Sequence, residues 1–340
     1  MKPKVLSILP RERFEKAEVT LPEELDFTFK HVIEEDDIID ACRGINFLFL
    51  PAAFPRITAA VLSNIPSVRM IQSAGTGYDK VDTESAARCN LPVANSPGAN
   101  ITTVAEFTVA MIIALQRRML IADREIKTGN YIPIREELFS GGLKEFSDLH
   151  LGLVGFGAIG RKVAQIAALL GARISYFDVF RPDPATEEQL QVIYKDFDDL
   201  LRTSEAVSIH TPLTKQTYHL IGRRELRLMA AGSILINTAR GEIVAPEALA
   251  DALEDEHLMG AAIDTLYPEP PPPDHPLLNL SSAARDRLLI TPHIAGTTKS
   301  AFRRMLSQAI ANIAAVAAGH PPKHVVNGVL KARGTNETLY

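Results

Sequence analysis

Apolar and polar positions alternate in two ways over the first hundred residues, and the alternation predicts the local structure. Short apolar runs bounded by polar or turn residues predict strands, and segments with apolar residues at helical spacing predict helices between them. The predicted strands span 5–9, 27–29, 45–50, 69–74 and 92–95, and the predicted helices lie near 36–42, 57–63 and 83–88. Strand–helix alternation of this kind predicts a parallel sheet with right-handed crossovers.

The pattern changes at about residue 102. A long amphipathic stretch predicts one helix over 102–127, and the Gly- and Pro-containing segment 128–142 predicts a loop. A second α/β series follows, and a final Ala-rich helix over 299–318 ends at Gly319, with two prolines just beyond as a stop signal. The strands predicted for this second series span 151–155, 173–178, 206–210, 233–239, 260–264 and 287–290. We therefore expect two α/β units, with the central unit inserted into the first.

Composition narrows the class of protein. The chain has 340 residues, 46% of them apolar, which is enough for two domains with cores of their own. Its net charge of −5 and pI near 6.0 indicate no basic surface for nucleic acid. Two cysteines, Cys42 and Cys89, form no CxxC motif and indicate a reducing compartment.

The chain also carries no pattern typical of export or of a membrane anchor. The N-terminus lacks a signal-peptide pattern, and the most apolar long segment, 104–115, falls short of the about 20 residues needed to cross a bilayer. We expect a cytoplasmic protein with neither a membrane nor a nucleic-acid partner.

The stretch 151–178 carries the most information about chemistry. An apolar strand runs into Gly155, and Gly157 and Gly160 follow before a helical pattern and a second strand that ends in Asp178. The first glycine permits a tight turn, the second lets the backbone approach a pyrophosphate, and the third lets helix and strand pack closely. The N–H groups and dipole at the helix start favour the phosphate charge. Glycines alone often mark ordinary turns, but this whole series predicts a dinucleotide site.

The residues around the glycines indicate which nucleotide binds. A P-loop is excluded because Arg161 and Lys162 follow the last glycine. Asp178 should accept hydrogen bonds from an adenosine ribose and repel a 2′-phosphate, which favours NAD over NADP. Arg181 lies close enough in sequence to weaken that preference.

Three residues that can carry chemistry follow predicted strands of the second series: Arg240, Glu269 and His293. Taken singly, each has an ordinary explanation. Arg240 could cap a strand at the surface, Glu269 could be solvated on a proline-rich loop, and His293 could be a neutral cap or a metal ligand. In open α/β sheets, however, ligands bind beyond the carboxyl ends of the strands.

Together with a nicotinamide site, these residues supply what hydride transfer to a 2-oxo acid requires. An arginine fork can polarise the ketone and hold the carboxylate. A histidine can deliver a proton to the developing alkoxide, and a carboxylate beside it stabilises the imidazolium and fixes its tautomer. We therefore interpret His293 as the proton carrier.

Nearly the whole chain, from about Val5 to Gly328, resembles the D-isomer-specific 2-hydroxyacid dehydrogenases. The matching stretches are SAGTGYDKVD (73–82), NSPGANITTVAEFTVAMIIAL (95–115), GLVGFGAIG (152–160), HTPLT (210–214), INTARGEIV (236–244), AAIDTLYPEP (261–270) and TPHIAG (291–296). The resemblance implies an α/β fold of two Rossmann-like domains. A flavodoxin-like substrate-binding domain would comprise residues 1–97 and 297–340, and an inserted NAD-binding Rossmann domain residues 98–296. The implied activity is NAD-dependent interconversion of a 2-oxo acid and a D-2-hydroxy acid.

Carried over position by position, the resemblance implies roles for particular residues. Arg240 would bind the substrate and polarise its carbonyl, Glu269 would support the protonated histidine, and His293 would be the general acid/base. The N–H groups of Gly75, Thr76 and Gly77 would hold the substrate carboxylate. The implied cofactor-binding residues are Thr76, Thr103, Thr238, Ala239, Asp264 and Gly296 toward the nicotinamide, Gly155, Gly157, Ala158, Ile159 and Gly160 at the pyrophosphate, Asp178 at the ribose, and Thr211 and Pro212 at the adenine. The resemblance implies no metal.

Proteins of this family typically form homodimers through their coenzyme domains. The Ala-, Val- and Ile-rich helix after Asn100 is the expected contact, and its other interpretation is an interdomain core helix. Two departures place the chain away from the commonest subgroups. Asp-Leu-His at 148–150 replaces the usual Gly-Lys, and Tyr131 stands near a position that often holds tryptophan.

The first domain should recognise the substrate side chain, near residues 48–57. Phosphoglycerate dehydrogenases commonly carry a basic residue just after the corresponding strand. This chain has Pro51, Ala52, Ala53 and Phe54 there, with Arg56 a little later. The difference favours a small or apolar 2-oxo acid.

Other activities of related proteins fit less well. Glu269 argues against formate dehydrogenase, which has glutamine at that position, and Thr76 argues against phosphite dehydrogenase, which typically has lysine. The alternative from another class is a non-catalytic NAD(H)-sensing scaffold of the co-repressor type.

Overall fold

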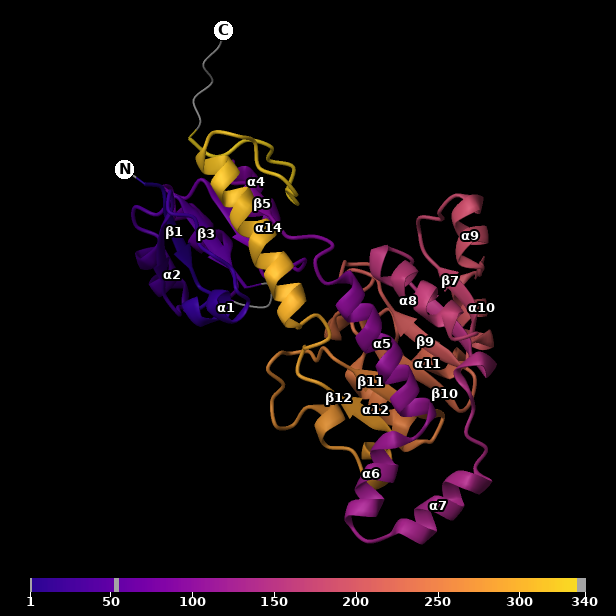
Figure 1. Ribbon diagram of the computed structural model, residues 1–340. Coiled ribbons are helices and arrows are strands. Elements are labelled where there is room, and N and C mark those ends of the chain that lie inside the picture. Colours follow the sequence, from indigo (N-terminus) through magenta and orange to yellow (C-terminus); the bar gives the residue numbers. More distant parts are fainter. Residues whose placement is uncertain (1, 52–54, 335–340) are drawn as a thin grey trace. The chain divides into compact units, whose positions relative to one another are not determined.

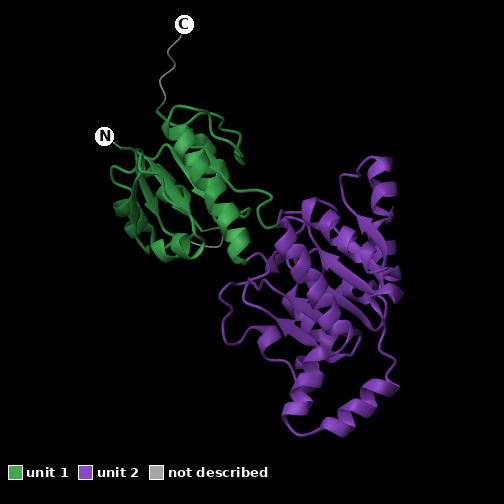
Figure 2. Cartoon of the chain, in the orientation of Figure 1, with its two compact units in different colours: residues 1–100, 297–340 green, residues 101–296 purple. Residues whose placement is uncertain are grey.

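The chain divides into two compact units in the computed structural model (Figure 2). Unit 1 comprises residues 1–100 and 297–340, and unit 2 comprises residues 101–296. The structure describes residues 2–51 and 55–334. Each unit has its own parallel sheet with helices, so the predicted α/β fold class is confirmed. The first boundary follows Asn100, whereas the family resemblance implied a boundary after residue 97.

Unit 1 is built on a five-stranded parallel sheet of order β2-β1-β3-β4-β5. Figure 1 labels three of these strands, β1, β3 and β5, and helix α14 beside them. Its elements are β1 (Lys4–Ser7), α1 (Arg11–Lys16), β2 (Asp26–Phe29), α2 (Glu35–Ala41), β3 (Phe47–Leu50), α3 (Ala59–Ser63), β4 (Met70–Ser73), α4 (Thr83–Arg88), β5 (Val93–Ala94) and α14 (Lys299–Ala317). Helix α14 belongs to unit 1 although it follows unit 2 in sequence, because the chain returns after the insertion.

Both faces of the unit 1 sheet are covered, which explains its continuous apolar strands. In β3, Phe47 and Phe49 share a core cluster with Leu306 of α14. Leu48, between them, belongs to the opposite cluster with Ile38 of α2. Successive side chains of a strand point to opposite faces, so the run Phe-Leu-Phe-Leu serves both clusters.

Unit 2 is built on a seven-stranded parallel sheet of order β12-β11-β10-β9-β6-β7-β8. Its strands are β6 (His150–Val154), β7 (Arg173–Phe177), β8 (Val192–Tyr194), β9 (Ala206–Ile209), β10 (Ser233–Asn237), β11 (Leu258–Ile263) and β12 (Leu288–Ile290). Its helices are α5 (Ile101–Gln116), α6 (Met119–Lys127), α7 (Tyr131–Ser140), α8 (Ala158–Leu169), α9 (Pro184–Leu190), α10 (Phe197–Thr203), α11 (Arg223–Leu228), α12 (Pro246–Glu254) and α13 (Ser282–Arg285), with 3₁₀ turns η1 (Phe146–Asp148), η2 (Gly241–Ile243) and η3 (Pro276–Leu278).

The strand order of unit 2 indicates where a ligand would bind, at the carboxyl ends of its central strands. The chain proceeds from β6 through β7 to β8 on one side and from β9 through β10 and β11 to β12 on the other. The order therefore reverses between β6 and β9, and open α/β sheets bind ligands at the carboxyl ends of strands beside such a reversal. The candidate site is therefore expected in the segments that follow these strands.

Helix α5 is part of the core of unit 2. Ala105, Val109, Ile112 and Leu115 are buried and share a cluster with Val163 of α8. The apolar residues that made this helix the expected dimer contact are thus largely used inside the unit.

The predicted single helix over 102–127 is wrong, because the chain forms α5 and α6 with a break between them. Arg118 adopts a left-handed φ of 49° at the break. Helix α6 has no buried residue, whereas α5 is buried along most of its length. The break therefore marks the point at which the chain leaves the core. The sequence has no glycine or proline at this point that would predict a break.

The predicted loop over 128–142 is also wrong, because it contains helix α7. Pro133 lies in the first turn of this helix. Backbone N–H groups of a first turn have no acceptor within the helix, so proline is tolerated there. Within residues 2–51 and 55–334, none of the helices has both the length and the apolar character needed to cross a bilayer.

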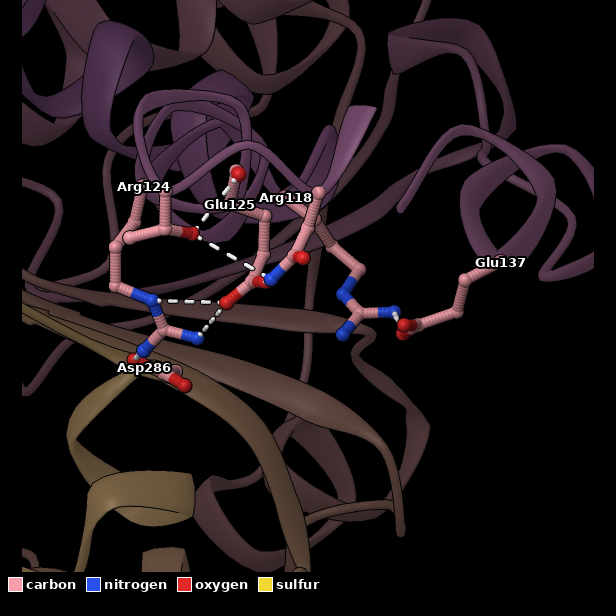
Figure 3. Close-up of polar contacts among 7 residues, drawn as sticks. Arg118, Arg124, Glu125, Glu137 and Asp286 are labelled. Atoms are coloured by element: carbon pink, nitrogen blue, oxygen red, sulfur yellow. Dashed lines mark hydrogen bonds and ion pairs between the residues drawn. The ribbon is translucent and has the colours of Figure 1, made fainter. Parts of the chain in front are cut away.

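Ion pairs hold α6 and α7 in place (Figure 3). Arg118 Nη1 lies 2.7 Å from Glu137 Oε1 of α7. Arg124 of α6 pairs with its neighbour Glu125 and with Asp286, which follows α13. These ion pairs connect the start of α6 with α7 and the middle of α6 with the end of α13.

Candidate active site

His293 and Glu269 form a side-chain pair beyond the carboxyl ends of β12 and β11. Nδ1 of His293 lies 3.1 Å from Oε1 and 3.0 Å from Oε2 of Glu269. The side chains are 33% and 35% exposed, so the pair is partly shielded and still accessible to a small molecule. Because Nδ1 faces a carboxylate, this nitrogen carries a proton and donates it, which assigns Nε2 as the ring nitrogen for proton exchange.

Asp264 holds the segment that carries His293. Its carboxylate is buried and accepts hydrogen bonds from Thr291 Oγ1 at 2.5 Å, Ile294 N at 2.9 Å and Ala295 N at 2.9 Å. Its carbonyl oxygen accepts from His293 N at 2.7 Å. His293 has a φ of 55°, in the left-handed region that non-glycine residues rarely adopt. Hydrogen bonds on both sides of the histidine maintain this conformation.

Arg240 follows β10, and Asn237 shapes its loop. Asn237 Nδ2 donates to the Arg240 carbonyl oxygen at 2.8 Å, and Asn237 Oδ1 accepts from Ala239 N at 3.0 Å. The Arg240 guanidinium donates through Nη1 to the Ala239 carbonyl oxygen at 2.8 Å. The buried side-chain amide of Asn237, the last residue of β10, thus fixes the backbone that carries the arginine side chain.

At Gly241 the loop that carries Arg240 packs closely against the loop that leads to Glu269. A Cβ at Gly241 would lie 2.4 Å from the carbonyl carbon of Leu266. Any other residue would therefore push the two loops apart. Glycine after Arg240 lets the segments that carry the arginine and the glutamate pack directly on each other.

The glycine turn after β6 fits a dinucleotide. Gly155 has a φ of 96°, and a Cβ there would lie 2.6 Å from the carbonyl carbon of His210. A Cβ at Gly160 would lie 2.3 Å from the Gly155 carbonyl oxygen, so only glycine lets α8 begin so close to the turn. A Cβ at Gly157, in contrast, would meet no atom within 4 Å. That side of the turn is open, as a close approach by pyrophosphate requires.

Asp178 ends the strand next to the glycine turn and supports it. Its Oδ2 accepts from Phe156 N at 2.6 Å, and its Oδ1 accepts from Phe180 N at 2.9 Å. A carboxylate has about four acceptor positions, so these bonds leave capacity for the hydroxyl groups of a ribose.

Most of the other predicted cofactor residues of unit 2 also lie at or near strand ends, and Thr103 lies in helix α5. Thr238 is buried after β10, with Oγ1 3.0 Å from Thr108 Oγ1 of α5. Thr211 follows β9, and its Oγ1 donates to the Pro212 carbonyl oxygen at 3.3 Å. The remaining positions are Thr103, buried in α5, Ala158 and Ile159 at the start of α8, Ala239 before Arg240, and Gly296 at the end of the unit.

The predicted carboxylate-binding loop belongs to unit 1 and follows β4. The carbonyl oxygens of Gly75, Thr76 and Gly77 accept hydrogen bonds from Ser96 N at 2.9 Å, Asn95 Nδ2 at 2.8 Å and Ser73 Oγ at 2.7 Å, respectively. These bonds fix the loop through its acceptors. Of the residues predicted to recognise the substrate side chain, Ala52, Ala53 and Phe54 lie outside the described residues, and Arg56 is exposed.

Sequence reasoning missed the supporting role of three residues. Asn237 and Gly241 lie within the INTARGEIV stretch, so their closeness to Arg240 was a usable signal. For Asp264, binding of the nicotinamide carboxamide stays a prediction; what the structure adds is that its carboxylate holds the histidine segment. Among the described residues, no three histidine, cysteine or acidic side chains gather in a way that could hold a metal ion.

A family model matches most of unit 2. Residues 109–295 match the model described as D-isomer specific 2-hydroxyacid dehydrogenase, NAD binding domain. The matched range contains the glycine turn, Arg240, Glu269 and His293.

Individual relatives share most of the chain. A glyoxylate reductase from Thermofilum pendens is 39% identical over 279 residues, which cover 82% of this chain and 80% of the relative. A hydroxypyruvate reductase from Thermotoga maritima is 33% identical over 285 residues, covering 83% and 88%. Among solved structures, apo D-mandelate dehydrogenase from Rhodotorula graminis has a TM-score of 0.84 at 25% identity and covers 98% of this chain and 99% of its own.

Proposed function

The chain belongs to the D-isomer-specific 2-hydroxyacid dehydrogenase family, and we propose that it reduces a small 2-oxo acid with His293 as general acid. It is an NAD-dependent 2-hydroxyacid oxidoreductase. Because the relatives described above are reductases and dehydrogenases, the non-catalytic scaffold is not retained.

The pair of His293 and Glu269 is the observation that carries the proposal. Proton transfer to an alkoxide needs a donor whose charged form is tolerated and whose tautomer is fixed. The Glu269 carboxylate meets both needs because both of its oxygens lie within hydrogen-bond distance of Nδ1. Nε2 then gives its proton to the substrate oxygen during reduction and takes it back during oxidation.

Arg240 supplies the positive charge that the reaction needs. Its planar fork can bind a carboxylate and polarise the neighbouring ketone, which a point charge does less well. When bound, NADH would supply the hydride that adds to C2 of the 2-oxo acid. For the N–H groups of Gly75, Thr76 and Gly77, carboxylate binding stays a prediction.

The open glycine turn and Asp178 would hold the coenzyme, with Asp178 as the ribose ligand. A carboxylate at this position accepts hydrogen bonds from the 2′- and 3′-hydroxyl groups and repels a 2′-phosphate. We therefore expect NADH to be preferred over NADPH.

The proposed substrate is a 2-oxo acid of the size of glyoxylate or hydroxypyruvate. The named relatives act on these compounds, and the sequence after the third strand favours a small or apolar side chain over a phosphate.

The test is NADH oxidation with glyoxylate, hydroxypyruvate, pyruvate, phenylpyruvate, 2-oxoisocaproate and 3-phosphohydroxypyruvate, repeated with NADPH. We expect the highest kcat/KM with glyoxylate or hydroxypyruvate and NADH. A preference for 3-phosphohydroxypyruvate, or no turnover with any of the six while NADH binds, would contradict the proposed substrate.

The proposal includes a homodimer formed through unit 2. Although α5 is largely buried, the adjoining helices expose apolar side chains: Met119 and Ile126 on α6, and Tyr131, Ile132 and Phe139 on α7, are 49% to 72% exposed. Ion pairs connect Arg118 with α7 and α6 with Asp286 (Figure 3), and these exposed apolar side chains are the proposed contact surface.

The mass in solution tests the dimer. We expect a dimer by light scattering for the wild type and a monomer for Phe139→Glu. Leu169, which is 88% exposed on α8, provides the matched control, because Leu169→Glu should leave the dimer intact. A monomeric wild type would exclude this part of the proposal.

A further inference from the structure

Arg181 follows the proposed ribose ligand Asp178 closely in sequence, and its side chain is already engaged. Its Nε lies 2.6 Å from Oε1 of Glu187, and its Nη2 lies 2.8 Å from Oε2, which makes a two-pronged ion pair. The guanidinium carbon also lies 4.9 Å from the ring centre of Tyr194, within the range of a cation–π contact. The arginine is therefore held by two residues at the β8 edge of the sheet.

Glu187 is anchored from the core side as well. The hydroxyl of Tyr176 donates to Oε1 of Glu187, and the Tyr176 ring is buried and stacks on Phe156. The Glu187 side chain is 14% exposed, whereas that of Arg181 is 57% exposed. The bonds from Arg181 and Tyr176 lower the pKa of Glu187 to about 2, so it is ionised at neutral pH.

We infer that Glu187 withholds Arg181 from the coenzyme and, with Asp178, makes the site select NAD over NADP. The inference rests on the proposed coenzyme site after β6 and β7. A 2′-phosphate beside the Asp178 carboxylate would need a cation to offset the repulsion. Arg181 lies close enough in sequence to be that cation, but Glu187 already engages its Nε and Nη2 and offsets its charge.

The pair acts as a competitor of the 2′-phosphate and not as an absolute barrier. Ion pairs with an exposed partner contribute little free energy, so a phosphate could draw the arginine away at some cost in affinity. Removing the competing carboxylate should therefore strengthen binding of a 2′-phosphate by about fivefold, a change typical of one surface ion pair. Binding of NADH, which lacks this phosphate, should not change.

The test compares binding of 2′,5′-ADP with that of 5′-AMP by calorimetry, together with NADH binding by fluorescence. Glu187→Gln should raise the affinity for 2′,5′-ADP relative to 5′-AMP by about fivefold, and Tyr176→Phe should raise it by less. Glu188→Gln is the matched control, because Glu188 carries the same charge on the same helix and is exposed. Adding Arg181→Ala to Glu187→Gln should abolish the gain.

Each outcome decides the inference. An equal affinity ratio in Glu187→Gln, Tyr176→Phe and the wild type, with NADH binding intact, would overturn it. An equal gain in Glu188→Gln would also overturn it, because the effect would then be one of overall charge. Failure of the wild type to bind NADH would instead overturn the proposed coenzyme site, and this inference with it.

Discussion

Two histidines of unit 2 lie just beyond the carboxyl ends of parallel strands, and their surroundings differ sharply. His293, after β12, faces the Glu269 carboxylate with a side chain that is 33% exposed. His210, after β9, has its Nε2 2.9 Å from Ser208 Oγ, and its backbone packs against Gly155. Although the residue keeps some accessible surface, burial of the ring lowers the pKa of His210 to about 3.

The comparison shows that position at a strand end does not make a histidine a proton carrier. Burial without an opposite charge disfavours the imidazolium, so His210 remains neutral at neutral pH and fills space beside the glycine turn. A carboxylate partner and solvent access instead let His293 carry charge. In the proposed function the two regions differ in kind: the glycine turn would present backbone to a dinucleotide, and the His293 region would present ionisable side chains to a substrate.

The largest effect should come from removing the proposed proton carrier. His293→Ala should lower kcat for 2-oxo acid reduction by about 10³-fold, the typical contribution of a general acid. NADH affinity, measured by fluorescence, should stay at the wild-type value because the glycine turn is untouched. A kcat near that of the wild type would remove the distinction between the two histidines.

A substitution at Arg240 tests whether the geometry of this side chain matters for catalysis as much as its charge. Arg240→Lys keeps the charge but loses the planar fork, so we expect kcat/KM to fall by about 10²-fold. Steady-state kinetics with the best 2-oxo acid measures this directly. Near-normal kcat/KM would show that a point charge suffices and would weaken the proposed role.

Asp264 tests whether His293 acts from a fixed position. Asp264→Asn places an amide where buried N–H and O–H donors require an acceptor, so the free energy of unfolding should fall by about 1–3 kcal/mol. Misplacement of the histidine should lower kcat by about 10- to 100-fold. In the His293→Ala background the same change should not lower kcat further, and an additional loss there would show that Asp264 acts in another way.

His210 should give the smallest effect on catalysis and a distinct effect on stability. His210→Asn should leave kcat close to the wild-type value. In the wild type the unfolded chain binds a proton below about pH 6.5, whereas the folded chain does not until about pH 3. Stability therefore falls as the pH drops below 6.5, by about 2 kcal/mol at pH 5, and does not change from this source at higher pH.

Denaturation at pH 7.5 and pH 5 measures that difference, and constant structural costs of the substitution cancel in it. We expect the stability loss between the two pH values to be smaller in His210→Asn than in the wild type. An equal loss would mean that the ring is protonated in the folded state, which would make the two histidines alike.

The sequence predicted the fold class and most of the strands, because apolar runs and turn residues are local signals. It missed β8, a three-residue strand at the edge of the unit 2 sheet. It could not predict the break at Arg118, because the chain leaves the core there without a glycine or proline. It also could not predict how Asp264 holds the histidine segment, because these hydrogen bonds join residues 27 to 31 positions apart. Local pattern identifies which residues stand at the site, whereas tertiary contacts decide how each is supported.

The pH dependence of kcat/KM for 2-oxo acid reduction, compared between the wild type and His293→Ala, tests the central claim most directly. If His293 donates the proton, the wild-type rate should fall about tenfold per pH unit on the alkaline side of one ionisation. The variant should lack this alkaline limb and react slowly at every pH. The same limb in His293→Ala would show that another group supplies the proton and would contradict the account.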